Sequence, residues 1–204
     1  SVALEEGGHA SEVTLASRLD GATSGVVPFA LGSEQCGAAQ WLRVQFAARQ
    51  VSKQYIALCS GRSLGPIGSK DEIDSPVLAV DGEGSGRRVV LSPLGKEART
   101  GYQVLDVLQW PGGEPEGQED VLTLLLVRPR TGRTHQIRVH LAGIGCPVVG
   151  DKVYGGITDA GDLHFTRLFL HCQKLSMLDL SGAAFEPEAP LPDELLEVLR
   201  TLRQ

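Results

Sequence analysis

Strand-forming runs dominate the pattern of apolar and polar residues along this chain. Residues 53–59 alternate between the two kinds, and residues 99–110 and 120–128 have the lengths of a pair of antiparallel strands. Shorter runs of the same composition occur before and after them. In chain order, the strands we predict cover residues 53–59, 76–80, 87–91, 99–110 and 120–128, with one or two more in residues 167–180.

Helical spacing is found in three other segments. Residues 33–50 are rich in alanine, and Leu42 and Phe46 lie four positions apart on one face. Residues 134–142 have helical spacing and are followed by glycines. Residues 192–202 begin with proline and acidic residues and place three leucines on one side, as expected of a helix that packs on a core.

Glycine and proline separate these elements and indicate loops. We predict loops at residues 61–75 and 111–119, and we interpret the second as a solvated loop rather than a domain boundary. Strands mostly follow strands, which predicts an α+β fold with a mainly antiparallel central sheet flanked by a few helices and loops. A chain of 204 residues supports one sizeable core, so a single domain over residues 1–204 is expected.

Composition excludes several classes of protein. No apolar run approaches the ~20 residues of a membrane-spanning helix, and no basic segment leads into an apolar one as in a secretory signal. The four cysteines are scattered, which favours buried thiols in a reducing, intracellular compartment over disulfides or a zinc site. We therefore expect no metal, and no membrane partner.

The net charge of −6 argues against nucleic acid, but the charges are unevenly distributed. Residues 121–152 carry five basic side chains against one acidic one, a local charge of +4. The basic residues of this stretch are Arg128, Arg130, Arg133, Arg138 and Lys152. A local patch of this kind can bind a phosphate backbone on an acidic protein.

Two segments carry residues suited to chemistry. In the first, Asp20 follows Arg18 and precedes small, turn-forming residues, so it can present a carboxylate at the rim of a cleft. On these residues alone, a structural role as a turn cap or as the partner of Arg18 is the better interpretation. In the second, residues 128–140, arginines and a glycine turn lead into a helix, which is a suitable anion site. His135 and His140 lie five apart, unlike a zinc-binding pair, and we predict structural or RNA-contacting roles for both.

Residues 17–25, 53–58 and 131–155 carry closely spaced fixed residues, and through them the sequence resembles the RluA-type pseudouridine synthases over most of its length. The family signature H-R-L-D-x-x-T-S-G is matched by residues 17–25 except at its first position, and K-x-Y-x-A-L is matched by residues 53–58. The long signature T-G-R-T-H-Q-I-R-V-H-L-A-x-x-G-x-P-x-x-G-D-x-x-Y-G is matched at every fixed position by residues 131–155. In the family's L-H-A strand, Cys172 replaces the alanine. The strand and K-P-x-G turn usual before the first signature have no counterpart in residues 1–16.

The resemblance implies the roles of particular residues. Asp20 aligns with the catalytic aspartate, Tyr55 with the tyrosine that stacks on the target base, and Arg138 with the arginine that pairs with the aspartate. Arg18 aligns with a residue that helps fill the space left by the flipped uridine. We expect the RNA-contacting residues to be Arg18, Thr23, Arg130, Arg133, His135, Gln136 and Lys152.

The implied reaction is isomerisation of uridine to pseudouridine in structured RNA, either tRNA or rRNA, without a cofactor. An ionised carboxylate can serve as a nucleophile or remove the 2′ proton, and the residues leave both routes open. Two alternatives remain: an RNA-binding or RNA-folding factor of the same fold with little turnover, and an enzyme acting on a small nucleotide. A monomer without a separate RNA-binding domain is expected.

Overall fold

The computed structural model describes residues 12–81, 87–110 and 121–204. The 7-stranded sheet at its centre has the spatial order β13-β12-β4-β9-β8-β5, with β2 beside β12. All pairs along this order are antiparallel, whereas β2 is parallel to β12. The strands of this sheet are Ser24–Gly25 (β2), Ser52–Gly61 (β4), Lys70–Asp74 (β5), Arg99–Leu108 (β8), Val121–Pro129 (β9), Leu170–Leu178 (β12) and Ala184–Phe185 (β13). The predicted α+β class with a mainly antiparallel sheet is confirmed.

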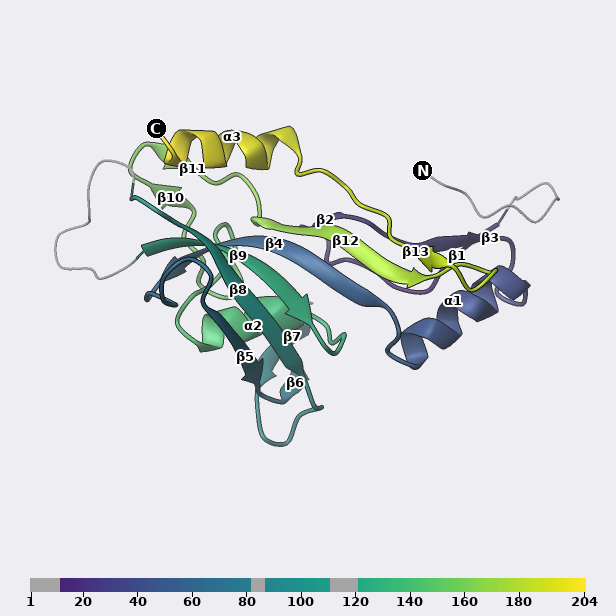
Figure 1. Ribbon diagram of the computed structural model, residues 1–204. Helices are drawn as coiled ribbons and strands as arrows, with labels where there is room; N and C mark the ends of the chain where they lie inside the picture. The colour runs from purple at the N-terminus through teal and green to yellow at the C-terminus, as the bar shows by residue number, and fades with distance from the viewer. Residues whose placement is uncertain (1–11, 82–86, 111–120) are drawn as a thin grey trace.

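Helices α2 (Gln136–Gly143) and α3 (Asp193–Leu202) lie on opposite faces of this sheet (Figure 1). Strand β4 is buried on both sides, and its alternating side chains separate into two cores. Tyr55, Ala57 and Cys59 pack in the core that includes α2, whereas Ile56 and Leu58 pack in the core that includes α3. The period of the strand therefore places Tyr55 on the same side of the sheet as α2.

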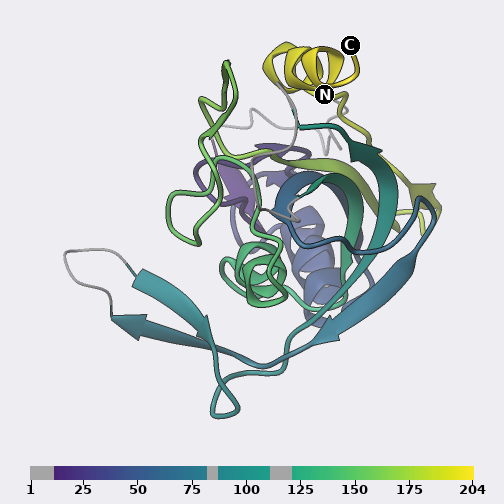
Figure 2. The ribbon, with the colours of Figure 1, turned by 90° about the vertical axis from the view of Figure 1, so that its left-hand side faces the viewer.

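A hairpin of β6 (Val77–Asp81) and β7 (Arg87–Leu91) projects away from the sheet (Figure 2). Val77 and Val89 at its base share a small core with Val139 of α2. Elsewhere, β1 (Val13–Leu15) pairs with β3 (Phe29–Leu31), and β10 (Asp159–Ala160) pairs with β11 (Leu163–His164). These short pairs were not predicted, because two or three residues are too few to show an apolar period.

Two predicted boundaries were wrong. Residues 70–74 belong to the predicted loop at 61–75 but form the edge strand β5, in which only Ile73 is buried. Its charged neighbours obscure the strand pattern, and the ladder to β8 supplies the stability instead. The helix predicted at 134–142 begins at Gln136, because His135 adopts a left-handed conformation with φ 53°.

The other predicted elements within the described residues are confirmed, with ends that differ from the prediction by a few residues. The first helix, α1 (Gly37–Ala47), begins after Cys36, whose Sγ accepts a hydrogen bond from the Ala39 N–H. The predicted loop at 111–119 lies outside the described residues. Cys59, Cys146 and Cys172 are buried as expected, whereas Cys36 is half-buried. No helix in the described part of the chain is long and apolar enough to cross a membrane.

Candidate active site

A cleft of about 600 Å³ opens where the segment before β2, the start of β4 and the β9–α2 connection meet. Asp20, Tyr55 and Arg138 all line it, although they are distant in sequence. Each comes from a different segment: Asp20 from the turn before β2, Tyr55 from β4 and Arg138 from α2. The fold thus brings the three residues that the resemblance singles out into one cavity.

Several backbone contacts hold the Asp20 turn in place. The Thr23 N–H donates to the Asp20 carbonyl at 2.8 Å, and Arg167 Nη2 donates to the Ala22 carbonyl at 3.2 Å. Gly25 has φ 125° and lies so close to β12 that a Cβ would overlap the Cys172 backbone. The turn is therefore fixed to the sheet just after Asp20. The Asp20 side chain keeps 24% of its surface exposed.

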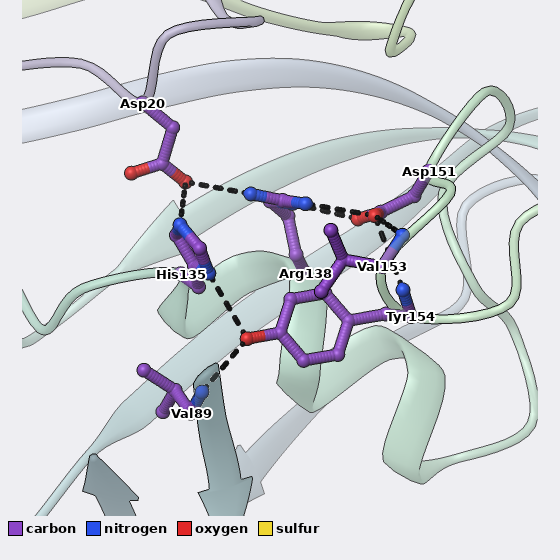
Figure 3. Close-up of polar contacts among 7 residues, drawn as sticks. All are labelled: Asp20, Val89, His135, Arg138, Asp151, Val153 and Tyr154. Atoms are coloured by element: carbon purple, nitrogen blue, oxygen red, sulfur yellow. Dashed lines mark hydrogen bonds and ion pairs between the residues drawn. The ribbon is translucent and has the colours of Figure 1, made fainter. Parts of the chain in front are cut away.

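Arg138 is shared between two carboxylates (Figure 3). Its Nε and Nη2 donate to Asp151 Oδ2 and Oδ1 at 2.6 and 2.8 Å, and its Nη1 lies 3.5 Å from Asp20 Oδ2. Only 9% of the Arg138 side chain is exposed, and the guanidinium lies over the Tyr154 ring, 5.1 Å from its centroid. Among the described residues, Asp20 forms an ion pair with Arg138 and not with Arg18, the partner considered for a purely structural role.

Asp151 fixes the orientation of this arginine. The carboxylate is fully buried, and its Oδ1 also accepts hydrogen bonds from the Val153 and Tyr154 N–H groups at 3.0 and 3.2 Å. Burial alone raises the pKa of Asp151, but Arg138 and the two N–H donors outweigh it and hold the pKa below its ordinary value. The pKa of Arg138 is raised in turn, because Asp151 and Asp20 outweigh the effect of burial. The pair is therefore ionised.

His135 and Tyr154 complete the surroundings of Asp20. His135 Nδ1 lies 3.0 Å from the Tyr154 hydroxyl, and its Nε2 lies 4.0 Å from Asp20 Oδ2. The Tyr154 oxygen accepts a hydrogen bond from the Val89 N–H at 3.1 Å. Chiefly through burial, the pKa of His135 is lowered and that of Tyr154 is raised, so both rings are neutral near pH 7.

Tyr55 lies deeper in the cleft and is 7% exposed. It faces Cys172 across the β4–β12 ladder and Val127 across the β4–β9 ladder. Burial, together with the Cys172 thiol and the Asp20 carboxylate, raises the pKa of Tyr55 well above its ordinary value. The residue therefore presents a neutral phenol in the same cleft as the Asp20 carboxylate.

The sequence of residues 3–143 matches the family of RNA pseudouridylate synthases. This chain belongs to that family. It is 35% identical over 182 residues to an uncharacterized RNA pseudouridine synthase of Zymomonas mobilis, covering 88% of this chain and 73% of the relative. It is also 35% identical to the dual-specificity RNA pseudouridine synthase RluA of Haemophilus ducreyi, over 79% of this chain and 66% of that protein. The solved structure of human RNA pseudouridylate synthase domain containing 1 aligns with a TM-score of 0.70 and 27% identity, covering 94% of this chain and 80% of its own.

Most of the RNA-contacting residues predicted for this pseudouridine synthase line the cleft. Arg18, Thr23, Arg130, Arg133, His135 and Gln136 do so, whereas Lys152 is exposed and is not among the lining residues. The Gln136 amide is occupied within the protein: its Nε2 donates to Arg99 O and Thr100 Oγ1, and its Oε1 accepts from Thr131 Oγ1 and the Arg133 N–H. Gln136 therefore supports the loop that carries the arginines.

Sequence reasoning assigned no role to three residues of this synthase site. Asp151 and Tyr154 are fixed letters of the long signature, which was the available signal, but their function depends on contacts made across the fold. Lys53 also lines the cleft, with its ammonium 5.0 Å from the centroid of the Phe46 ring. Burial lowers the pKa of Lys53. The sequence feature that could have indicated a role for Lys53 was its place as the lysine of K-x-Y-x-A-L.

Proposed function

We propose that this chain isomerises uridine to pseudouridine in structured RNA, with Asp20 as the catalytic carboxylate. The observation that carries the proposal is the partly exposed Asp20 in the cleft, beside an arginine whose orientation a buried second aspartate fixes. Two bacterial relatives carry names that state RNA pseudouridine synthesis, and membership of the family supports the same reaction here.

The proposed reaction breaks the C1′–N1 bond of uridine, rotates the uracil and joins C1′ to C5. One Asp20 oxygen faces Arg138 and His135, and Figure 3 shows the other pointing away from both. This second oxygen is available to the nucleoside, either as a nucleophile or as a base toward the 2′ proton. Arg138 stabilises the carboxylate charge as substrate displaces water from the cleft.

Tyr55 is proposed to stack on the uracil and to take part in moving the C5 proton. Its raised pKa keeps the phenol protonated, so it accepts a proton only while releasing its own. A base in a helix cannot reach this depth, so the uridine must flip out at a cost of a few kcal/mol. The basic side chains at the cleft, Arg18, Lys53, Arg130 and Arg133, are proposed to contact the flanking phosphates and offset that cost.

The substrate is proposed to be tRNA or rRNA. Relatives include a dual-specificity synthase RluA and, at 32% identity, the ribosomal large subunit pseudouridine synthase D of Xanthomonas campestris. A folded RNA can supply a loop or a bulge from which a uridine flips, as the depth of the cleft requires. The cluster of basic residues also favours a polynucleotide over a small nucleotide.

The test uses unmodified tRNA and rRNA transcripts, incubated with the wild type, with Asp20→Ala and with Asp162→Ala, and mapped by carbodiimide-based sequencing. Asp162 is an exposed aspartate between β10 and β11 and serves as the matched control. We expect pseudouridine at defined positions with the wild type and the control, and none with Asp20→Ala. Modification by Asp20→Ala would remove Asp20 from the reaction. RNA binding without any product from the wild type would favour the RNA-binding or RNA-folding factor.

A further inference from the structure

The Tyr154 hydroxyl determines which nitrogen of His135 carries the proton. A tyrosine hydroxyl has a single hydrogen to donate. Its oxygen already accepts the Val89 N–H at 3.1 Å, and His135 Nδ1, at 3.0 Å, is the acceptor within its reach among the described residues. The opposite assignment would leave the half-buried hydroxyl hydrogen without an acceptor, which is costly. Tyr154 therefore donates to Nδ1, and the hydrogen of the neutral imidazole is on Nε2.

That Nε2–H faces the candidate catalytic carboxylate. His135 Nε2 lies 4.0 Å from Asp20 Oδ2, the same oxygen that lies 3.5 Å from Arg138 Nη1 (Figure 3). Catalytic hydrogen bonds are often long before substrate binds and shorten in the complex. Two donors, one at the N-cap of α2 and one in its first turn, thus converge on one carboxylate oxygen and leave the other free.

The backbone of His135 is held in an unfavourable conformation to achieve this. Its φ of 53° and ψ of 16° lie in the left-handed region at the start of α2, and the side chain makes no capping hydrogen bond to the helix. The imidazole instead packs edge-on against Tyr154, with ring centroids 5.7 Å apart and an interplanar angle of 86°. The strained residue directs its ring toward Asp20 rather than toward the helix end.

We propose that His135 is a positioning residue for Asp20, acting as a neutral Nε2–H donor whose tautomer is fixed by Tyr154. The inference rests on the proposed function and goes beyond the RNA-contacting role predicted for His135. A neutral donor can fix Oδ2 without adding a second cation beside Arg138. Protonation of Nδ1 would disrupt the contact with Tyr154, so acid should uncouple the ring from its support.

The charges around His135 act in both directions. Asp20 and Asp151 favour its protonation, whereas burial, Arg138 and Arg18 oppose it, and the balance lowers the pKa of His135. Tyr154, the remaining titratable group in contact, has a pKa raised chiefly by burial and is protonated at neutral and acidic pH. The positioning form is thus the one present near neutral pH and is lost on acidification.

The experiment compares His135→Ala, His135→Gln and Tyr154→Phe under single-turnover conditions with saturating enzyme. Alanine and glutamine place the same demand on the left-handed backbone, so their difference isolates the donor group. For His135→Ala we expect the saturated rate to fall about 10- to 100-fold, with the RNA dissociation constant changed less than about threefold. His135→Gln, whose amide N–H can replace Nε2–H, should recover most of the rate. The control is His164→Gln, because His164 is exposed and pairs with Asp159 at the surface.

The pH profile distinguishes positioning from a structural role. The wild-type rate should fall on the acid side as His135 becomes protonated, and His135→Gln should lack that limb. An unchanged saturated rate in His135→Ala with a weaker RNA affinity would overturn the proposal in favour of RNA contact. A loss of rate that glutamine does not restore would overturn it in favour of structural support.

A second measurement does not depend on activity. Long-range ¹⁵N–¹H spectra of the protein with labelled histidine should show the Nε2–H tautomer of His135 in the wild type and a mixture or the Nδ1–H form in Tyr154→Phe. An Nδ1–H tautomer in the wild type would overturn the proposal even if no RNA were modified. Failure of the proposed function would instead appear as a wild type without product and with the expected tautomer.

Discussion

Arg138 contacts two carboxylates whose surroundings differ sharply. Asp151 is fully buried and meets the guanidinium through two short hydrogen bonds, with two backbone N–H groups completing its shell. Asp20 keeps 24% of its side chain exposed and meets the same guanidinium through one contact of 3.5 Å. One carboxylate has its hydrogen-bonding capacity filled by protein, whereas the other retains capacity for a substrate.

Asp20 and Asp151 therefore have different roles, although their side chains are chemically identical. A buried ion pair gains little net stability over an apolar pair, because desolvation offsets the attraction, but breaking it is costly. The Asp151–Arg138 pair therefore sets the plane of the guanidinium within the core. With that plane fixed, Nη1 points at the cleft and Asp20 can stay partly solvated without losing its partner.

The largest effect that we expect comes from Asp20→Asn. Replacing the proposed catalytic carboxylate by an isosteric amide would remove the nucleophile or base, so the rate of pseudouridine formation should fall by about 10²- to 10⁴-fold. Stability should change by less than about 1 kcal/mol, because the side chain is partly exposed and has a single long contact to Arg138. Single-turnover assays and urea denaturation measure the two quantities. A large loss of stability would contradict the difference in role between Asp20 and Asp151, since Asp20 would then also anchor the Arg138 side chain.

For Asp151→Asn, in contrast to Asp20→Asn, we expect a large loss of stability. This change leaves the Arg138 charge buried without its closest anion and should lower the free energy of unfolding by about 3–5 kcal/mol. Urea denaturation checks it, with Asp159→Asn as the control because Asp159 is an exposed aspartate in a surface ion pair. Equal stabilities for the wild type and Asp151→Asn would mean that the guanidinium does not depend on this anchor.

Acidification should remove the stabilisation by the Asp151–Arg138 pair without a mutation. The pKa of Asp151 is depressed in the folded protein, so the unfolded chain binds its proton first as the pH falls. The stabilisation is complete above the unfolded value of about 3.9 and is lost as the pH falls through the folded value. Unfolding free energies measured from pH 6 downward should therefore converge for the wild type and Asp151→Asn. A constant difference between the two over that range would contradict the assignment.

The two regions also differ in how far sequence predicts them. The alternation of apolar residues in β4 predicts a strand, and this strand places Tyr55 on the face of the sheet that carries α2. The edge strand β5 escaped prediction because four of its five residues are charged and only Ile73 is buried. Its stability comes from pairing with β8, which is distant in sequence and leaves no local pattern.

The sequence predicted which residues line the candidate site better than it predicted how they contact one another. The family signatures pointed to Asp20, Tyr55 and Arg138, which do line one cleft. The role of Asp151 depends on a turn that brings the carboxylate back to α2 from 13 residues further along the chain. The left-handed backbone of His135 could not be predicted from residue preferences, because only a small fraction of non-glycine residues adopt that conformation. Such features arise from tertiary contacts that spacing alone does not encode.

The smallest effects that we expect concern the exposed arginines at the cleft, and they extend the comparison to charges that face solvent. Arg130 and Arg133 keep guanidinium groups outside the core: Arg130 has a contact of 3.7 Å to Glu72, and Arg133 donates to the Glu97 carbonyl. Replacing either by glutamine should weaken RNA binding a few-fold and reduce the slope of log affinity against log salt by about one. Asp20→Asn should leave that slope unchanged, because its charge is paired within the protein and contacts no phosphate.

Filter binding of a tRNA transcript from 50 to 200 mM salt measures all three variants, with Arg200→Gln on the exposed face of α3 as the control. Slopes that shift for Asp20→Asn but not for the arginine variants would mean that the buried network, rather than the exposed arginines, governs RNA affinity.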